Sequence, residues 1–349
     1  MSDETIILTT AKTAKIVLNT PQKLNALDMS MIAPLGDALA AWKDDDNVKA
    51  VIIKGAGDKA FCAGGDVVGV CQQGKNNVAK AAEFFRAEYR TNWRIKNFPK
   101  PYIALIDGIV MGGGVGVSVH GHYRIATEKT MLAMPETTIG FFPDVGGTYF
   151  LSRLKNKIGM FLGLTGHRVF GADLLELGIA THYIESDKLD ALEAALTQAD
   201  YGADAFATID AILAKHCTQP TEQGAFAELA DQAGRLFTAD SLAEIMANLA
   251  ADDSEFSAKI QKTLSRMSPT SMAVTFAQIK QGAELDFDQC MQTEMRIATH
   301  MLEADDFYEG VRALLVDKDK SPKWQPQADA KNYFKPITKE LVLDWNQLL

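Results

Sequence analysis

Two glycine-rich segments, each following a short apolar run, place the strongest limits on how this chain can fold. The segment AFCAGGDV covers residues 60–67, and VMGGGVGVSV covers residues 110–119. Each follows a strand-like run and precedes a stretch that is typical of a helix. Glycine at such a junction lets backbone N–H groups approach a ligand closely, and a helix N-terminus adds partial positive charge. The glycines fit either a pair of donor loops that form an oxyanion hole or two tight turns.

The rest of the first half also alternates between strand-like and helix-like segments. Residues 15–21 and 49–57 are typical of strands, and residues 28–45 predict a helix with Asp28 as its N-cap. Residues 101–114 are expected to be a buried strand that ends in glycine. After Asp187 almost every segment has helical spacing. The sequence therefore predicts an α/β core over residues 1–187 and a helical region over residues 188–349.

Composition limits the class of partner. The 349 residues include 35 lysines and arginines against 45 acidic residues, which gives a formal net charge of -10. That balance argues against nucleic acid or an anionic membrane as the main partner, although a small anionic ligand stays possible. No apolar run reaches the roughly 18 residues of a membrane helix. The acidic start MSDETIILTT does not resemble a targeting segment, and the four cysteines are dispersed, so we expect a cytoplasmic protein.

Known ligand and nucleophile motifs do not account for the glycines. A dinucleotide fingerprint is absent because Val117 stands where its last glycine would be, and no GK[ST] follows either segment. The run GVSVH at 116–120 nearly matches a nucleophile elbow, but His120 replaces its second glycine. Ser118 also lies inside the expected helix rather than at its entrance. We therefore interpret Ser118 as a small packed side chain.

Two carboxylates lie in unusually apolar surroundings. The run LAMPETTIGFFPDVGG, residues 132–147, holds Glu136 and Asp144, each directly after a proline. Removal from water disfavours the charged form of an acid, so its pKa rises toward the working range of a general acid or base. Alternatively, Glu136 and Asp144 could each stabilise a turn and take no part in catalysis. Their position downstream of the glycine segments makes both candidates for catalysis, because a base and backbone donors act together.

Metal and thiol chemistry have little support. His120 and His122 have no third ligand nearby in the sequence, so no metal site is expected. Cys62 adjoins the first glycine pair, and we interpret it as a small buried residue rather than a nucleophile. No bound cofactor is expected.

The motifs together resemble the crotonase (enoyl-CoA hydratase/isomerase) superfamily. The resemblance rests on AFCAGGDV, KPYIALIDGIVMGGGVGVSVHG and YRIATEKTMLAMPETTIGFFPDVGGTYFLSRL, and it extends to DFYEGVRALLVDKDKSPKW near the C-terminus. It is greatest with the superfamily's acyl-CoA hydrolases, thioesterases of valine breakdown. It implies a spiral of ββα units followed by a helical region, and an acyl-CoA as the substrate. A homo-oligomer is also possible by this resemblance.

The resemblance assigns roles to particular residues. The backbone N–H groups of Gly65 and Gly113 would form the oxyanion hole for a thioester carbonyl. Glu136 and Asp144 would be catalytic, and Glu88 would contact the substrate together with them and Gly113. The CoA moiety would lie along the backbone of Cys62, Ala63, Gly64 and Gly65.

A departure at Gly116 distinguishes subfamilies. Hydratases of the superfamily place a catalytic glutamate at this position, and they commonly have glycine where this chain has Asp144. The exchange favours hydrolysis, with Glu136 either attacking the thioester or activating water. Three alternatives stay open: an enoyl-CoA hydratase or isomerase on the same fold, a serine hydrolase using Ser118, and a non-catalytic acyl-CoA-binding protein.

Overall fold

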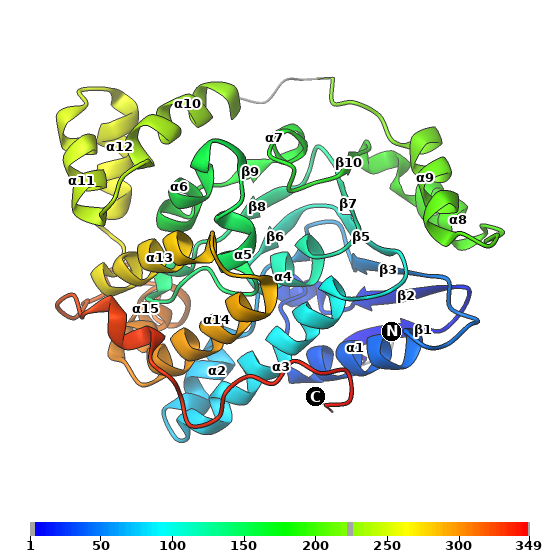
Figure 1. Cartoon of the computed structure of the whole chain (residues 1–349), viewed down its shortest axis with the longest axis horizontal. Helices are drawn as coiled ribbons and strands as arrows, with labels where there is room; N and C mark the ends of the chain where they lie inside the picture. The colour runs from blue at the N-terminus through cyan, green and yellow to red at the C-terminus, as the bar shows by residue number, and fades with distance from the viewer. Residues whose placement is uncertain (1–3, 222–225, 348–349) are drawn as a thin grey trace.

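Strands that alternate between two sheets build the core of the chain. The computed structural model describes residues 4–221 and 226–347 (Figure 1). The larger sheet has the strand order β1-β2-β3-β5-β7-β10, and only its β1–β2 pair is antiparallel. Its strands are β1 (Ile6–Thr9), β2 (Thr13–Leu18), β3 (Ala50–Gly55), β5 (Tyr102–Ile106), β7 (Tyr123–Ala126) and β10 (His182–Tyr183). The smaller sheet consists of β4 (Ala60–Cys62), β6 (Ile109–Met111), β8 (Met131–Ala133) and β9 (Val169–Phe170).

The chain passes from the larger to the smaller sheet in each repeat. It runs from β3 to β4, from β5 to β6 and from β7 to β8, and the first two pairs lead into helices. The helices after β4 are α2 (Val67–Gly74) and α3 (Val78–Lys96), and α4 (Gly113–Val119) follows β6. This succession is the ββα spiral that the resemblance to the crotonase superfamily implied.

The segment 101–111 differs from the single strand expected there. It forms both β5 and β6, because Gly108 turns the chain from one sheet to the other with a φ of +79°. A Cβ at Gly108 would lie 2.5 Å from the carbonyl oxygen of Lys59, so the close approach of two backbones also requires glycine. Apolar residues lie on both sides of the turn, so the sequence pattern does not separate β5 from β6.

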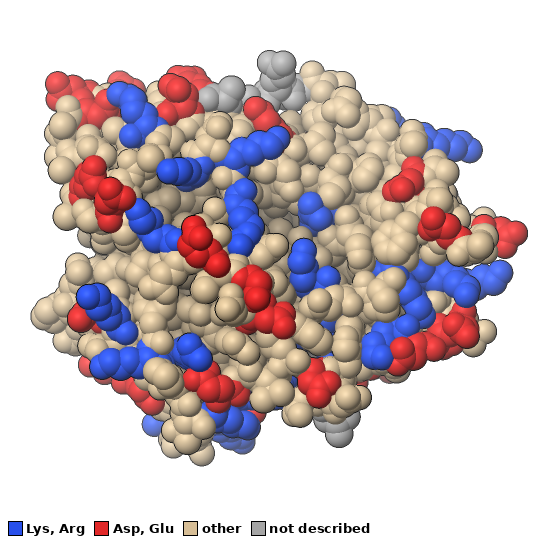
Figure 2. All heavy atoms as spheres, viewed as in Figure 1, with Lys and Arg blue, Asp and Glu red and all other residues tan. Residues whose placement is uncertain are grey.

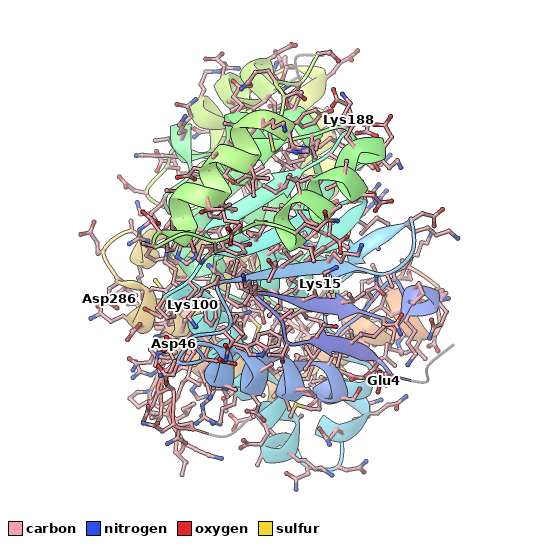
Figure 3. All side chains as sticks on the ribbon, turned by 90° about the vertical axis from the view of Figure 1, so that its right-hand side faces the viewer. Glu4, Lys15, Asp46, Lys100, Lys188 and Asp286 are labelled. Carbon is pink, nitrogen blue, oxygen red and sulfur yellow. The ribbon has the colours of Figure 1, made fainter. Side chains whose placement is uncertain are left out.

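The larger sheet is covered on both faces, which explains its unbroken apolar strands. Along β3, Val51 and Ile53 contribute to the main core, while Ala50 and Ile52 face the opposite side. Helix α1 (Met29–Trp42) packs on the main-core side of the sheet, and Asp28 caps it by accepting from the N–H of Ser30. Helices α8 (Leu189–Thr197) and α9 (Ala205–His216) lie across the other face (Figure 3). Lys15 on β2 pairs with Glu193 of α8 at 3.0 Å.

The remaining helices follow β8 in the chain, and among them α14 packs against α3. They are α5 (Gly147–Leu151), α6 (Ile158–Thr165), α7 (Gly171–Glu176), α10 (Phe226–Phe237), α11 (Leu242–Ala251), α12 (Glu255–Leu264), α13 (Pro269–Gly282), α14 (Phe287–Leu302) and α15 (Asp305–Val311). A π-helical turn, η5 (Arg312–Val316), follows α15 directly. The final segment then runs back along α3, where Arg86 donates to the carbonyl oxygens of Lys339 and Glu340. In Figure 1 the red C-terminal segment runs beside α3 and ends near α1.

The division at residue 187 stays a prediction. Helices α8 and α9 follow that residue and pack on the sheet, while α13 and α14 contribute to the same main core as β2 and β3. Packing across a boundary does not decide whether either part folds alone.

Acidic and basic side chains are interspersed on the face that Figure 2 shows. None of the helices in the described ranges combines the length and apolar character needed to cross a membrane.

Candidate active site

A cavity of about 310 Å³ opens where the two glycine segments, α3 and the segment after β8 meet. Its walls are mostly backbone and apolar side chains, including Phe84, Phe85 and Phe141. Three buried carboxylates also line it: Glu88, Glu136 and Asp144. Leu314 and Leu315 of the π-helical turn complete the lining from the C-terminal side. The structure therefore brings all three candidate acids to the glycine segments, although they come from separate parts of the chain.

The two glycine segments touch one another at the cavity wall. A Cβ at Gly113 would lie 3.3 Å from the nitrogen of Gly65, and one at Gly114 would lie 2.3 Å from the carbonyl oxygen of Cys62. Gly113 is the first residue of α4, so its N–H has no acceptor within the helix. The backbone N–H of Gly65 likewise donates to no other backbone group in the described part of the chain. Two free donors close together are the geometry that an oxyanion hole requires.

Glu136 begins the short 3₁₀ helix η2 (Glu136–Ile139), directly after Pro135. It is 7% exposed, and its Oε2 atom has no hydrogen-bond partner among the described residues. A Cβ at Gly112 would lie 2.9 Å from Oε1, which places this carboxylate against the second glycine segment. Burial raises the pKa of Glu136 well above its usual value, and the negative charge of Asp144 adds to the shift.

Asp144 is held from α3. The hydroxyl of Tyr89 donates to Oδ2 of Asp144 at 2.8 Å, and both side chains are buried. Burial raises the pKa of Asp144 to about 7, while the hydrogen bond from Tyr89 opposes that rise. An acid with a pKa near neutrality exchanges protons readily under working conditions. Asp144 is thus suited to proton transfer in this cavity.

Glu88 belongs to the inward face of α3 and is not a solvated helix acid. It is 2% exposed, and its Oε1 has no hydrogen-bond partner within the described ranges. A Cβ at Gly113 would lie 2.3 Å from Oε1, so a side chain at this position would have to displace the Glu88 carboxyl group. Burial raises the pKa of Glu88 well above its usual value, and Asp144 and Glu136 contribute further. A protonated Glu88 can donate a hydrogen bond to a ligand.

The space beside Gly116 is filled by other side chains. A Cβ there would lie 2.6 Å from Cβ of Val145 and 2.8 Å from Nδ2 of Asn92. A larger side chain at this position would have to displace both neighbours. Asn92 is fully buried, and neither of its side-chain polar atoms has a partner in the described structure. The wall on which hydratases of the superfamily carry a glutamate is therefore closed in this chain.

The remaining candidates from the sequence lie in different settings. Ala63, Gly64 and Gly65 line the cavity, whereas Cys62 is buried behind them and is not part of the lining. Burial raises the pKa of the Cys62 thiol to about 12, so a thiolate is disfavoured. Ser118 donates to the carbonyl oxygen of Gly114 at 2.8 Å inside α4 and does not reach the cavity.

Among the residues that the structure describes, no three His, Cys, Asp or Glu side chains are arranged so that they could hold a metal ion. His120 Nε2 instead lies 2.7 Å from the carbonyl oxygen of Val145. Burial lowers the pKa of His120 to about 3, so this imidazole is neutral.

Sequence reasoning missed two residues that support the site. Tyr89 holds Asp144, and its position beside Glu88 was the only available signal. Glu294 on α14 accepts from the backbone N–H groups of Gly146 and Thr148, at 2.8 Å each. Nothing in the helical pattern of residues 286–302 separates an inward, hydrogen-bonded acid from a solvated one.

The comparisons with known proteins agree with this architecture. A family model described as enoyl-CoA hydratase/isomerase matches residues 13–335. The chain belongs to this family, the crotonase superfamily. Its fold matches a crystal structure described as a carnitinyl-CoA dehydratase from Mycobacterium thermoresistibile, with a TM-score of 0.90, 37% identity and coverage of 98% of this chain and 99% of that one. A crystal structure described as an enoyl-CoA hydratase from Rhodobacter sphaeroides gives a TM-score of 0.88 at 34% identity, covering 97% and 99% of the two chains.

Relatives in sequence carry a different name. The chain is 46% identical over 336 residues to a protein from Xenopus laevis that is named 3-hydroxyisobutyryl-CoA hydrolase, mitochondrial. The aligned region covers 94% of this chain and 87% of that protein. The human protein of the same name is 42% identical over 347 residues, with coverage of 96% and 89%. The crotonase-like fold expected from the sequence is confirmed.

Proposed function

We propose that this protein is an acyl-CoA thioesterase that hydrolyses 3-hydroxyisobutyryl-CoA to 3-hydroxyisobutyrate and CoA, a step of valine degradation. The names of the relatives at 42–46% identity support this substrate. The observation that carries the proposal is the arrangement of Glu136, Asp144 and Glu88 around the free N–H groups of Gly65 and Gly113. The closed wall at Gly116 supports hydrolysis over hydration.

In the proposed mechanism the thioester carbonyl oxygen accepts from the N–H groups of Gly65 and Gly113. These donors stabilise the negative charge that develops on the oxygen during attack. Glu136 first loses to water the proton that its raised pKa favours; its carboxylate oxygen then attacks the carbonyl carbon, the C–S bond breaks, and the CoA thiolate leaves. Water then hydrolyses the resulting anhydride and regenerates the Glu136 carboxylate. In the variant mechanism Glu136 takes a proton from water, which attacks the thioester directly.

Asp144 supplies and removes protons in this proposal. Its pKa near 7 lets it give a proton to the leaving thiolate and recover one from water. Glu88 lines the cavity, its Oε1 has no hydrogen-bond partner among the described residues, and it contacts the substrate in this proposal. Its raised pKa favours the protonated form, which hydrogen-bonds to the 3-hydroxyl or the thioester without adding a further negative charge.

Hydration or isomerisation of an enoyl-CoA is the second candidate. The close structural likeness to proteins described as a dehydratase and a hydratase favours it. A single base such as Glu136 is sufficient for isomerisation. The reactions differ in product, because only hydrolysis releases a free thiol.

The deciding experiment compares three thioesters: 3-hydroxyisobutyryl-CoA, 3-hydroxypropionyl-CoA and crotonyl-CoA. Thiol release is measured for each, and loss of enoyl absorbance is followed for crotonyl-CoA. Rapid thiol release from the hydroxyacyl esters supports the hydrolase. Enoyl loss without thiol would establish hydration, and tight binding without any turnover would leave a non-catalytic acyl-CoA-binding protein.

Two further expectations accompany the function. The names of the relatives place those proteins in mitochondria, and the cytoplasmic location of this chain stays a prediction that cell fractionation would test. A homo-oligomer also stays a prediction, and light scattering of the purified protein would test it. Neither affects the proposed chemistry.

A further inference from the structure

Glu294 is a buried acid outside the cavity whose two oxygens are both committed to one distant turn. It lies in α14 and is 0% exposed. Its Oε2 accepts from the N–H of Gly146 and its Oε1 accepts from the N–H of Thr148, each at 2.8 Å. These donors precede Glu294 by 148 and 146 residues in sequence. A carboxyl group that accepts from two backbone donors fixes both their separation and their direction.

The turn that Glu294 holds has an unfavourable backbone. Val145 has a φ of +50° and Gly146 a φ of +87°, both in the left-handed region. A β-branched residue is rare there, because its Cβ crowds the backbone. Such a conformation persists only where the surrounding structure holds it. Because Asp144 is the residue immediately before this pair, the direction of its side chain depends on the turn.

Other side chains hold the carbonyl groups of the same turn. Nε2 of Gln278, on α13, donates to the carbonyl oxygen of Pro143 at 2.6 Å. Nε2 of His120 lies 2.7 Å from the carbonyl oxygen of Val145. Glu294 differs from both because it accepts from N–H groups, those of Gly146 and Thr148. Residues 143–148 are therefore fixed at both types of backbone group.

We propose that Glu294 is a positioning residue that keeps Asp144 directed at the acyl-CoA by holding the turn that follows it. Tyr89 anchors the side chain of Asp144, and Glu294 anchors the backbone beyond it. The inference rests on the proposed function, since it assigns Glu294 a part in the same reaction. It predicts that a substitution that removes the hydrogen bonds of Glu294 lowers the rate of the chemical step and leaves the affinity for the substrate unchanged.

The test uses Glu294→Gln and Glu294→Asp in the full-length protein. Glutamine keeps one acceptor oxygen but turns an NH₂ group toward the second backbone donor. Aspartate keeps the carboxyl group but is one methylene shorter, so it cannot reach both donors from the same backbone position. Glu284→Gln is the matched control, because Glu284 is exposed and lies just before α14. Thermal unfolding of each variant verifies that it is folded.

Three quantities are measured for each protein. Steady-state kinetics with 3-hydroxyisobutyryl-CoA give kcat and KM separately. Amide hydrogen exchange, followed by mass spectrometry of peptides, reports the protection of residues 144–151. We expect Glu294→Gln to lower kcat roughly 10- to 100-fold with KM changed less than about threefold, since misplacing a catalytic group by about 1 Å has that scale of effect. Exchange should accelerate in residues 144–151 and not in α3 or α13.

Several outcomes would overturn the inference. An unchanged kcat in folded Glu294→Gln would show that the turn keeps Asp144 in place without this carboxylate. Equal losses of protection throughout α13 and α14 would show a general structural role instead. If Glu294→Gln does not fold, Glu294→Asp decides by the same criteria. If the wild-type protein releases no thiol, the proposed function is wrong. Unchanged amide exchange in residues 144–151 of the variants would separately reject the role of Glu294 in holding the turn.

Discussion

Glu136 is the residue on which the proposed chemistry depends most directly. Glu136→Gln keeps the size and polarity of the side chain but removes both the nucleophilic oxygen and the base. We expect kcat to fall by at least about 10³-fold, because both mechanistic variants need the carboxylate. Binding of acyl-CoA, measured by calorimetry, should stay within a few-fold of the wild type. Full activity in this variant would exclude both versions of the mechanism.

Tyr89 tunes Asp144 through a single hydrogen bond. The hydroxyl donates to Oδ2 of Asp144 and lowers the pKa of that carboxyl, which burial has raised to about 7. In Tyr89→Phe the donor is lost while the ring is kept, so the pKa of Asp144 should rise further. The inflection of kcat against pH that belongs to Asp144 should move to higher pH. A profile that matches the wild type within error would show that Asp144 does not control the rate.

At the scale of elements, the packing of α4 against α3 and the 143–148 segment excludes a side chain at Gly116. Gly116→Ala places a Cβ within 2.8 Å of both Asn92 and Val145. We expect the free energy of unfolding to fall by about 1–3 kcal/mol, the usual range for overpacking a dense core. Denaturant titration measures the change. Gly202→Ala is the control, because nothing lies within 4 Å of a Cβ at Gly202. Equal stabilities of the two variants would contradict this explanation.

Helix α3 shows how one element serves two sides of the molecule. Glu88, Tyr89 and Asn92 are spaced at helical intervals and point toward the cavity or the neighbouring α4. Arg86 and Arg94 lie on the other side of the helix and donate to backbone carbonyls of the C-terminal segment. The burial of Arg86 and Arg94 could not be predicted from the sequence, because a helical pattern does not identify the segment that will cover these side chains.

At the scale of the whole molecule, the buried acids couple stability to pH. Burial raises the pKa of Asp144 to about 7 and that of Glu294 to about 8, while Glu88 and Glu136 shift in the same direction. The folded state therefore binds more protons than the unfolded chain at neutral pH. Their contribution to stability is complete below about pH 4 and is lost as the pH rises through the folded-state values.

We accordingly expect the free energy of unfolding to decrease between about pH 6.5 and 8.5. Below that range the neutral His120 acts in the opposite direction, because the unfolded chain protonates near pH 6.5 and the folded imidazole only near pH 3. Denaturant unfolding at several pH values measures the slope. Asp144→Asn removes one titrating group and should reduce it. A flat wild-type curve over this range would contradict the raised pKa values.

The amino-acid sequence by itself determined the superfamily, the alternation of strands and helices, and the candidates Glu136, Asp144, Gly65 and Gly113. These features depend on local spacing and on motifs within short segments, which a sequence displays directly. Tertiary structure alone decided that Tyr89 holds Asp144, that Asn92 and Val145 close the wall at Gly116, and that Glu294 reaches a turn 146–148 residues earlier. Helical periodicity shows that a face is buried but does not identify its partner, because that choice is made when distant elements pack together.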